Sequence, residues 1–104
     1  MNASSAKGDL SQTVGRAFFG NFRHLQPSQR HAITPIRTGS DVLILAGTGS
    51  GKTEAALAPL VDRFLPVMRS ATAPSLVHIS PTRALANDLL RRLEPPLDRL
   101  GLSV

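Results

Sequence analysis

The sequence predicts an α/β fold in which helices cover both faces of a parallel sheet, three layers in all. Two short apolar runs, 41–46 and 75–80, have the continuous hydrophobicity of buried parallel strands. Each run is followed by a segment with apolar residues at helical spacing. A glycine-rich loop separates the first run from its helix. This alternation of strands and helices is typical of right-handed βαβ units.

The first part of the chain is expected to be a tail followed by a short helix. Residues 1–10 are small and polar, so we expect them to be disordered. Residues 11–104 are expected to form the domain, beginning with a helix over about 11–22. The aromatic residues expected in its core are Phe18, Phe19 and Phe22.

A second helix is expected to begin near Pro27, which suits a first helical turn, and to end before Gly39. The residues at buried spacing in this helix are Gln29, Ala32, Ile33 and Ile36. Because a polar group on an apolar face needs a hydrogen-bond partner, we expect Gln29 to have one.

Two further helices and a third strand are expected in the rest of the chain. The helix after the glycine-rich loop is expected to end near Leu65, and the helix after residue 80 is expected to end at Pro95 and Pro96. Residues 102–104 have the character of a third strand. The sheet is therefore expected to stop after about two to three strands.

Residues 46–53, with the sequence AGTGSGKT, have the pattern of a phosphate-binding loop before a helix. Ala46 stands where the first glycine of the usual pattern would be. The residues expected to surround the phosphates are Gly47, Thr48, Gly49, Ser50 and Gly51. Lys52 would neutralise the β- and γ-phosphates, and the Thr53 hydroxyl would ligate Mg²⁺. We assign the catalytic contribution of this chain to Lys52 and Thr53, with ATP and Mg²⁺ as cofactors.

Three blocks occur in a fixed order: Gln29, the loop 46–53, and residues 81–88 with the sequence PTRALAND. Together they resemble a superfamily 2 helicase of the DEAD/DEAH-box group. The third block is more similar to the large helicase-related type than to the DEAD-box type, which usually has Glu where Ala84 stands. The resemblance covers roughly 18–104 and implies the N-terminal part of a first RecA-like domain.

The resemblance also implies roles for residues outside the loop. Gln29 would bind adenine through its carboxamide and favour ATP over GTP, although it could instead cap the helix or bond a nearby backbone group. Pro81, Thr82 and Arg83 would contact a nucleic-acid backbone, DNA or RNA. The alternatives are a plain N-cap at Thr82 and a solvated arginine at Arg83.

Composition is consistent with a nucleic-acid partner. The formal net charge is +5, and all of the 12 basic residues except Lys7 and Lys52 are arginines. Residues 1–12 lack the apolar core of a secretory signal, and the sequence has no apolar run long enough for a membrane span, so we expect a cytoplasmic protein without membrane contact.

The activity expected of this chain alone is binding rather than turnover. A helicase of this type hydrolyses ATP with an Asp-Glu motif and with arginines of a second domain, and we find neither here. We expect the remainder of the motor to supply them. The alternative is a non-catalytic nucleotide- or nucleic-acid-binding fragment. A small kinase, which shares the loop, would need a lid and an acceptor pocket.

Overall fold

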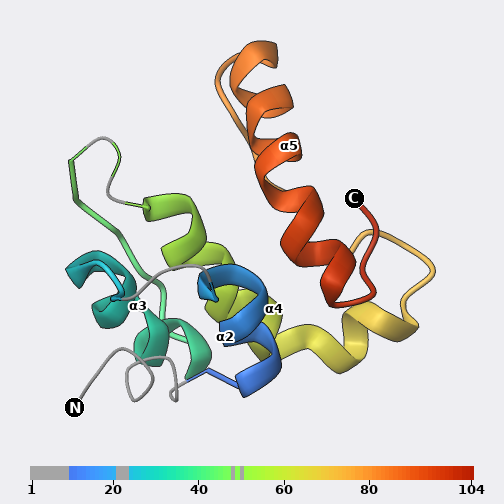
Figure 1. Cartoon of the computed structure of the whole chain (residues 1–104), viewed down its shortest axis with the longest axis horizontal. Coiled ribbons are helices and arrows are strands. Elements are labelled where there is room, and N and C mark those ends of the chain that lie inside the picture. Colours follow the sequence, from blue (N-terminus) through green and yellow to red (C-terminus); the bar gives the residue numbers. More distant parts are fainter. Residues whose placement is uncertain (1–9, 21–23, 48, 50) are drawn as a thin grey trace. The chain divides into compact units, whose positions relative to one another are not determined.

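The computed structural model describes residues 10–20, 24–47, 49 and 51–104. Within these residues the chain forms four helices (Figure 1). They are α2 (Gln12–Phe19), α3 (Pro27–Arg37), α4 (Lys52–Ser70) and α5 (Arg83–Arg99). The chain divides into two compact units, Met1–Phe64 and Leu65–Val104, each with its own internal contacts.

The expected parallel sheet is wrong for this structure, because the described residues contain helices and no β-strand. The segments 41–46, 75–80 and 102–104 are irregular and have no ladder partner among the described residues. A parallel strand is stabilised by hydrogen bonds to neighbouring strands and by burial of both faces, and these segments have neither. The RecA-like α/β architecture is therefore corrected to a helical one.

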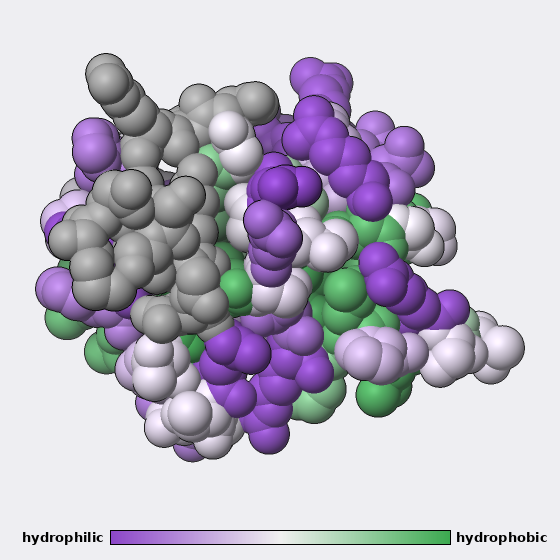
Figure 2. All heavy atoms as spheres, turned by 60° about the horizontal axis from the view of Figure 1, so that its bottom comes forward, coloured by the Kyte–Doolittle hydropathy of each residue, from purple (hydrophilic) through white to green (hydrophobic). Residues whose placement is uncertain are grey.

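The apolar side chains of these irregular segments lie largely in solvent. Their exposed fractions are 81% for Leu43, 84% for Leu45, 76% for Val77 and 88% for Ile79. Figure 2 shows hydrophobic side chains, in green, at the molecular surface among hydrophilic ones. The apolar runs thus have the composition of buried strands, but most of their apolar side chains are exposed.

Helix α2 begins with an N-terminal cap at Ser11. The Ser11 hydroxyl accepts a hydrogen bond from the Val14 backbone N–H at 3.3 Å. Phe18 and Phe19 are buried, which confirms their expected place in the core. Phe22 lies outside the described residues, and so do residues 1–9 of the expected tail. Leu10, the last residue of that expected tail, is described and is buried.

Helix α3 begins and ends where the sequence predicts. Pro27 is its first residue, and Gly39 follows its end with a positive φ of 92°. The Thr38 hydroxyl donates to the Thr34 carbonyl at 2.9 Å across the last turn. The helix continues through Pro35, which removes one backbone donor without ending it.

Helices α4 and α5 are longer than expected. Helix α4 continues past Leu65 to Ser70, and α5 runs through Pro95 and Pro96 to Arg99. Each proline removes a single backbone hydrogen bond, whereas the bonds on either side of it remain available. No helix in the described part of the chain is both long and apolar enough to span a bilayer.

Candidate nucleotide-binding site

The predicted phosphate loop ends at the N-terminus of α4. The Gly51 carbonyl accepts the first helical hydrogen bond, from the Ala55 N–H at 3.0 Å. Gly49 and Gly51 have φ values of 79° and 76°, a left-handed conformation that favours glycine. Thr48 and Ser50 lie outside the described residues. A helix N-terminus with left-handed glycines before it is typical of phosphate-binding loops.

Lys52 is exposed at the first position of α4 and turns back over its own loop. Its Nζ atom donates to the Ala46 carbonyl oxygen at 2.8 Å. The contact uses the backbone of Ala46 and so does not depend on its side chain. Thr53, the next residue, is half-buried. The Lys52 side chain is therefore held against the start of the loop.

Gln29 is a polar residue buried in the core, with an exposed fraction of 8%. Its Oε1 atom accepts from the Gln26 N–H at 2.9 Å. Its Nε2 atom donates to the Gly51 carbonyl oxygen at 3.3 Å. The capping alternative considered from the sequence is thus present in the structure, and the same side chain also contacts the phosphate loop.

These two contacts use half of the hydrogen-bonding capacity of the Gln29 carboxamide. A carboxamide has two N–H donors and an oxygen with two lone pairs, and the contacts use one of each. One donor and one acceptor remain, which is the pair that an adenine edge requires. Capping and base recognition are chemically compatible at this residue.

The approach of Gln29 to the loop depends on the absence of a side chain at Gly51. A Cβ atom built on Gly51 would overlap Nε2 of Gln29. At Gly47, by contrast, a Cβ atom would meet no other heavy atom within 4 Å. Gly51 is therefore required both by its backbone conformation and by its neighbour.

The residues expected to contact nucleic acid belong to the second unit. Pro81, Thr82 and Arg83 are all exposed, at and just before the start of α5. The Thr82 hydroxyl accepts from the Leu85 N–H at 3.1 Å, as an N-cap does. The cap that the sequence suggested as an alternative is present, and the exposed helix N-terminus beside it favours anions.

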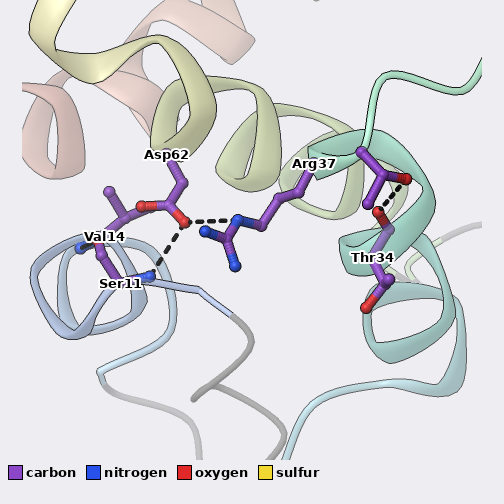
Figure 3. A network of polar contacts seen from close by, with 6 residues as sticks. Ser11, Val14, Thr34, Arg37 and Asp62 are labelled. Atoms are coloured by element: carbon purple, nitrogen blue, oxygen red, sulfur yellow. Dashed lines mark hydrogen bonds and ion pairs between the residues drawn. The ribbon is translucent and has the colours of Figure 1, made fainter.

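Sequence reasoning did not single out Asp62. Its side chain is 4% exposed and pairs with Arg37 Nε at 3.0 Å. The same oxygen, Oδ2, accepts from the Ser11 N–H at 3.0 Å (Figure 3). A signal was present, because Asp62 lies seven residues after the buried Ala55 and so on the apolar stripe of α4.

Comparison with known proteins agrees with the motifs. A sequence model of the DEAD/DEAH box helicase family matches residues 26–104. The ATP-dependent helicase Lhr-Core protein 2 of Thermococcus barophilus is 36% identical over 91 residues, covering 85% of this chain and 10% of that protein. The ATP-dependent DNA helicase DDX31 of Dictyostelium discoideum is 38% identical over 89 residues, covering 82% of this chain and 10% of that protein.

A bacterial relative extends the match to most of the chain. The Lhr helicase/probable uracil glycosylase of Mycolicibacterium smegmatis is 34% identical over 97 residues, covering 92% of this chain and 6% of that protein. No solved structure matches the chain significantly. The chain therefore belongs to the DEAD/DEAH box helicase family, which confirms the resemblance. It spans about a tenth of the length of the first two relatives.

Proposed function

We propose that this chain is the ATP-binding part of an ATP-dependent helicase, in which ATP hydrolysis drives the unwinding of DNA or RNA. The observation that carries the proposal is the convergence of two side chains on one loop. Lys52 bonds the Ala46 carbonyl, and Gln29 bonds the Gly51 carbonyl. A group suited to phosphate and a group suited to a base thus meet at the N-terminus of α4.

In this proposal the loop binds ATP through its backbone and through Lys52. The N–H groups of residues 47–51 surround the phosphates, while the ammonium of Lys52 leaves the Ala46 carbonyl and neutralises the β- and γ-phosphates. The Thr53 hydroxyl ligates Mg²⁺, which when bound neutralises further phosphate charge. The free half of the Gln29 carboxamide bonds the adenine edge and favours ATP over GTP.

The second unit is proposed to bind the nucleic-acid backbone. Thr82 caps α5, so that its exposed N-terminus can face a phosphate, and Arg83 and Pro81 contact the same backbone. Contacts of this kind read no base sequence. They suit either polymer, and proteins similar to this chain include both a DNA helicase and an RNA helicase by name.

Equilibrium binding of a fluorescent ATP analogue, with Mg²⁺ present, tests the nucleotide proposal. The wild-type chain should bind ATP more tightly than GTP, and Lys52→Ala should weaken ATP binding by roughly tenfold or more. The matched control is Lys7→Ala, which removes the other lysine of the chain and should leave the affinity unchanged. Equal affinity of the wild type and Lys52→Ala would overturn the proposal.

A pair of substitutions at Thr82 separates its two roles. Aspartate and serine both cap helices well, so Thr82→Asp and Thr82→Ser should keep the stability of α5. The added negative charge of Thr82→Asp should nevertheless weaken binding of single-stranded DNA or RNA, whereas Thr82→Ser should not. If both variants bind nucleic acid as the wild type does, Thr82 is a helix cap alone.

The proposals for the whole protein extend beyond this chain. We infer that the remainder of the motor supplies the acids and arginines needed for hydrolysis, so that this chain alone should bind ATP with little turnover. An ATPase rate that nucleic acid stimulates and Lys52→Ala abolishes would contradict this expectation. The cytoplasmic location stays a prediction.

A further inference from the structure

Helices α3 and α4 contact each other at three successive levels within the first unit. Near the start of α3, Gln29 bonds the carbonyl of Gly51, the residue before α4. In the middle, Ala32 and Ile36 share an apolar cluster with Ala55. At the end, Arg37 pairs with Asp62. Because the contacts advance along both helices together, α3 lies along α4 and runs in the same general direction.

The last of these contacts is made by a deeply buried acid. The Asp62 side chain is 4% exposed, whereas that of Arg37 is 42% exposed. Oδ2 of Asp62 accepts from both Arg37 Nε and the Ser11 N–H, each at 3.0 Å. Burial of a carboxylate is unfavourable unless charged or N–H donors compensate for the lost water. Asp62 therefore favours the arrangement in which α3 and the start of α2 both lie against α4 (Figure 3).

Asp62 is too distant to touch a nucleotide bound at the loop. Asp62 lies ten positions after Lys52 along α4, which corresponds to about 15 Å of helix. A route to the loop passes through Arg37 and α3, whose Gln29 lies against Gly51. The small residues Ala32 and Ala55 between the two polar contacts allow the helix backbones to approach closely.

We propose that Asp62 is a positioning residue for base recognition, which holds α3 along α4 so that the Gln29 carboxamide stays in register with the phosphate loop. The inference rests on the proposed function. It assigns Asp62 and Arg37 an effect on which base is bound, with little effect on how tightly the phosphates are bound. The proposed phosphate contacts come from the loop before α4 and from Lys52, the first residue of α4, and not from α3.

The test compares binding of ATP, GTP and inorganic tripolyphosphate by the 104-residue chain. Asp62→Asn keeps the size of the side chain and one carbonyl acceptor but removes the charge, and Arg37→Gln removes the charge from the other partner. Both variants should lower the ratio of ATP affinity to GTP affinity toward one while the tripolyphosphate affinity stays unchanged. Asp62→Ala should lower the ratio further. The matched control is Asp88→Asn on α5, an exposed acid, which should keep the wild-type ratio.

Hydrogen exchange of the ligand-free chain gives an independent readout. In Asp62→Asn the amides of α3 should exchange faster than in the wild type, with the amides of α5 unchanged. Suppose that the wild type prefers ATP and that Asp62→Asn, Asp62→Ala and Arg37→Gln all keep its ratio of ATP affinity to GTP affinity. This result would overturn the inference but leave the proposed function standing. Equal loss of affinity for all three ligands would reduce Asp62 to a stability role and also overturn it. A wild type that binds ATP and GTP equally would overturn the proposed function, and the inference with it.

Discussion

At the scale of single residues, two polar groups on apolar helix faces organise the first unit. Gln29 lies on the buried stripe of α3, and Asp62 lies on that of α4. The helical spacing of Gln29 indicated burial and the need for a partner, but not which partner. One partner, the Gln26 N–H, is close in sequence, and the other, the Gly51 carbonyl, is distant. Spacing can predict only the local one.

Gly51 and Gly47 allow a direct test of this geometry. Gly51→Ala should destabilise the chain by about 1–2 kcal/mol, because alanine is strained at a positive φ and its Cβ would displace Gln29. Gly47→Ala should cause no loss of stability, since its φ is not positive and the added Cβ has open space. Urea unfolding followed by circular dichroism measures both. Equal stability of the two variants would contradict the contact between Gln29 and Gly51.

At the scale of elements, local sequence signals placed the helices better than they placed their ends or the strands. The start of α3 at Pro27 and its end before Gly39 are confirmed, since both residues act through their own backbone conformation. Helix α5, however, passes through Pro95 and Pro96. A missing donor lowers helix stability at one bond, and the neighbouring bonds decide whether the helix continues.

The apolar segment 41–46 provides the test at this scale. Leu45 is 84% exposed, so Leu45→Ala should change the free energy of unfolding by no more than about 0.5 kcal/mol. Ile33 in α3 is 1% exposed, so Ile33→Ala should cost about 2–5 kcal/mol. Urea midpoints of the two variants give the comparison. A large loss of stability in Leu45→Ala would indicate that this side chain is buried in solution.

At the scale of the whole molecule, charge is the property with the clearest consequence. The net charge of +5 attracts polyanions without selecting among them. The described residues fall into two compact units, with the phosphate loop in one and Thr82 and Arg83 in the other. The proposed binding of ATP and the proposed binding of nucleic acid can therefore be tested separately.

Salt dependence provides the test at the scale of the molecule. Affinity for single-stranded nucleic acid should fall linearly on a plot of log K against log salt concentration. Arg83→Gln should reduce the magnitude of the slope by about 0.7, the value expected for one phosphate contact on a single strand. Arg91→Gln, on the exposed surface of the same helix, should leave the slope unchanged. Equal slopes for the wild type and Arg83→Gln would exclude a phosphate contact at Arg83.

The sequence by itself determined the features that depend on neighbouring residues. These include the course of α2 and α3, the left-handed glycines of the loop, the cap at Thr82 and the motifs that mark a DEAD/DEAH box helicase. Each depends on backbone preferences or hydrogen bonds within a few residues, and a motif is by nature a local pattern.

Only the tertiary structure decided which distant residues meet. Strand-like composition at 41–46 and 75–80 did not produce a sheet, because a ladder needs a second segment at hydrogen-bonding distance. The burial of Asp62 against Arg37 and the contact of Gln29 with Gly51 likewise join residues 25 and 22 positions apart, respectively. Composition and periodicity describe one segment at a time, whereas these contacts depend on how α3 packs along α4.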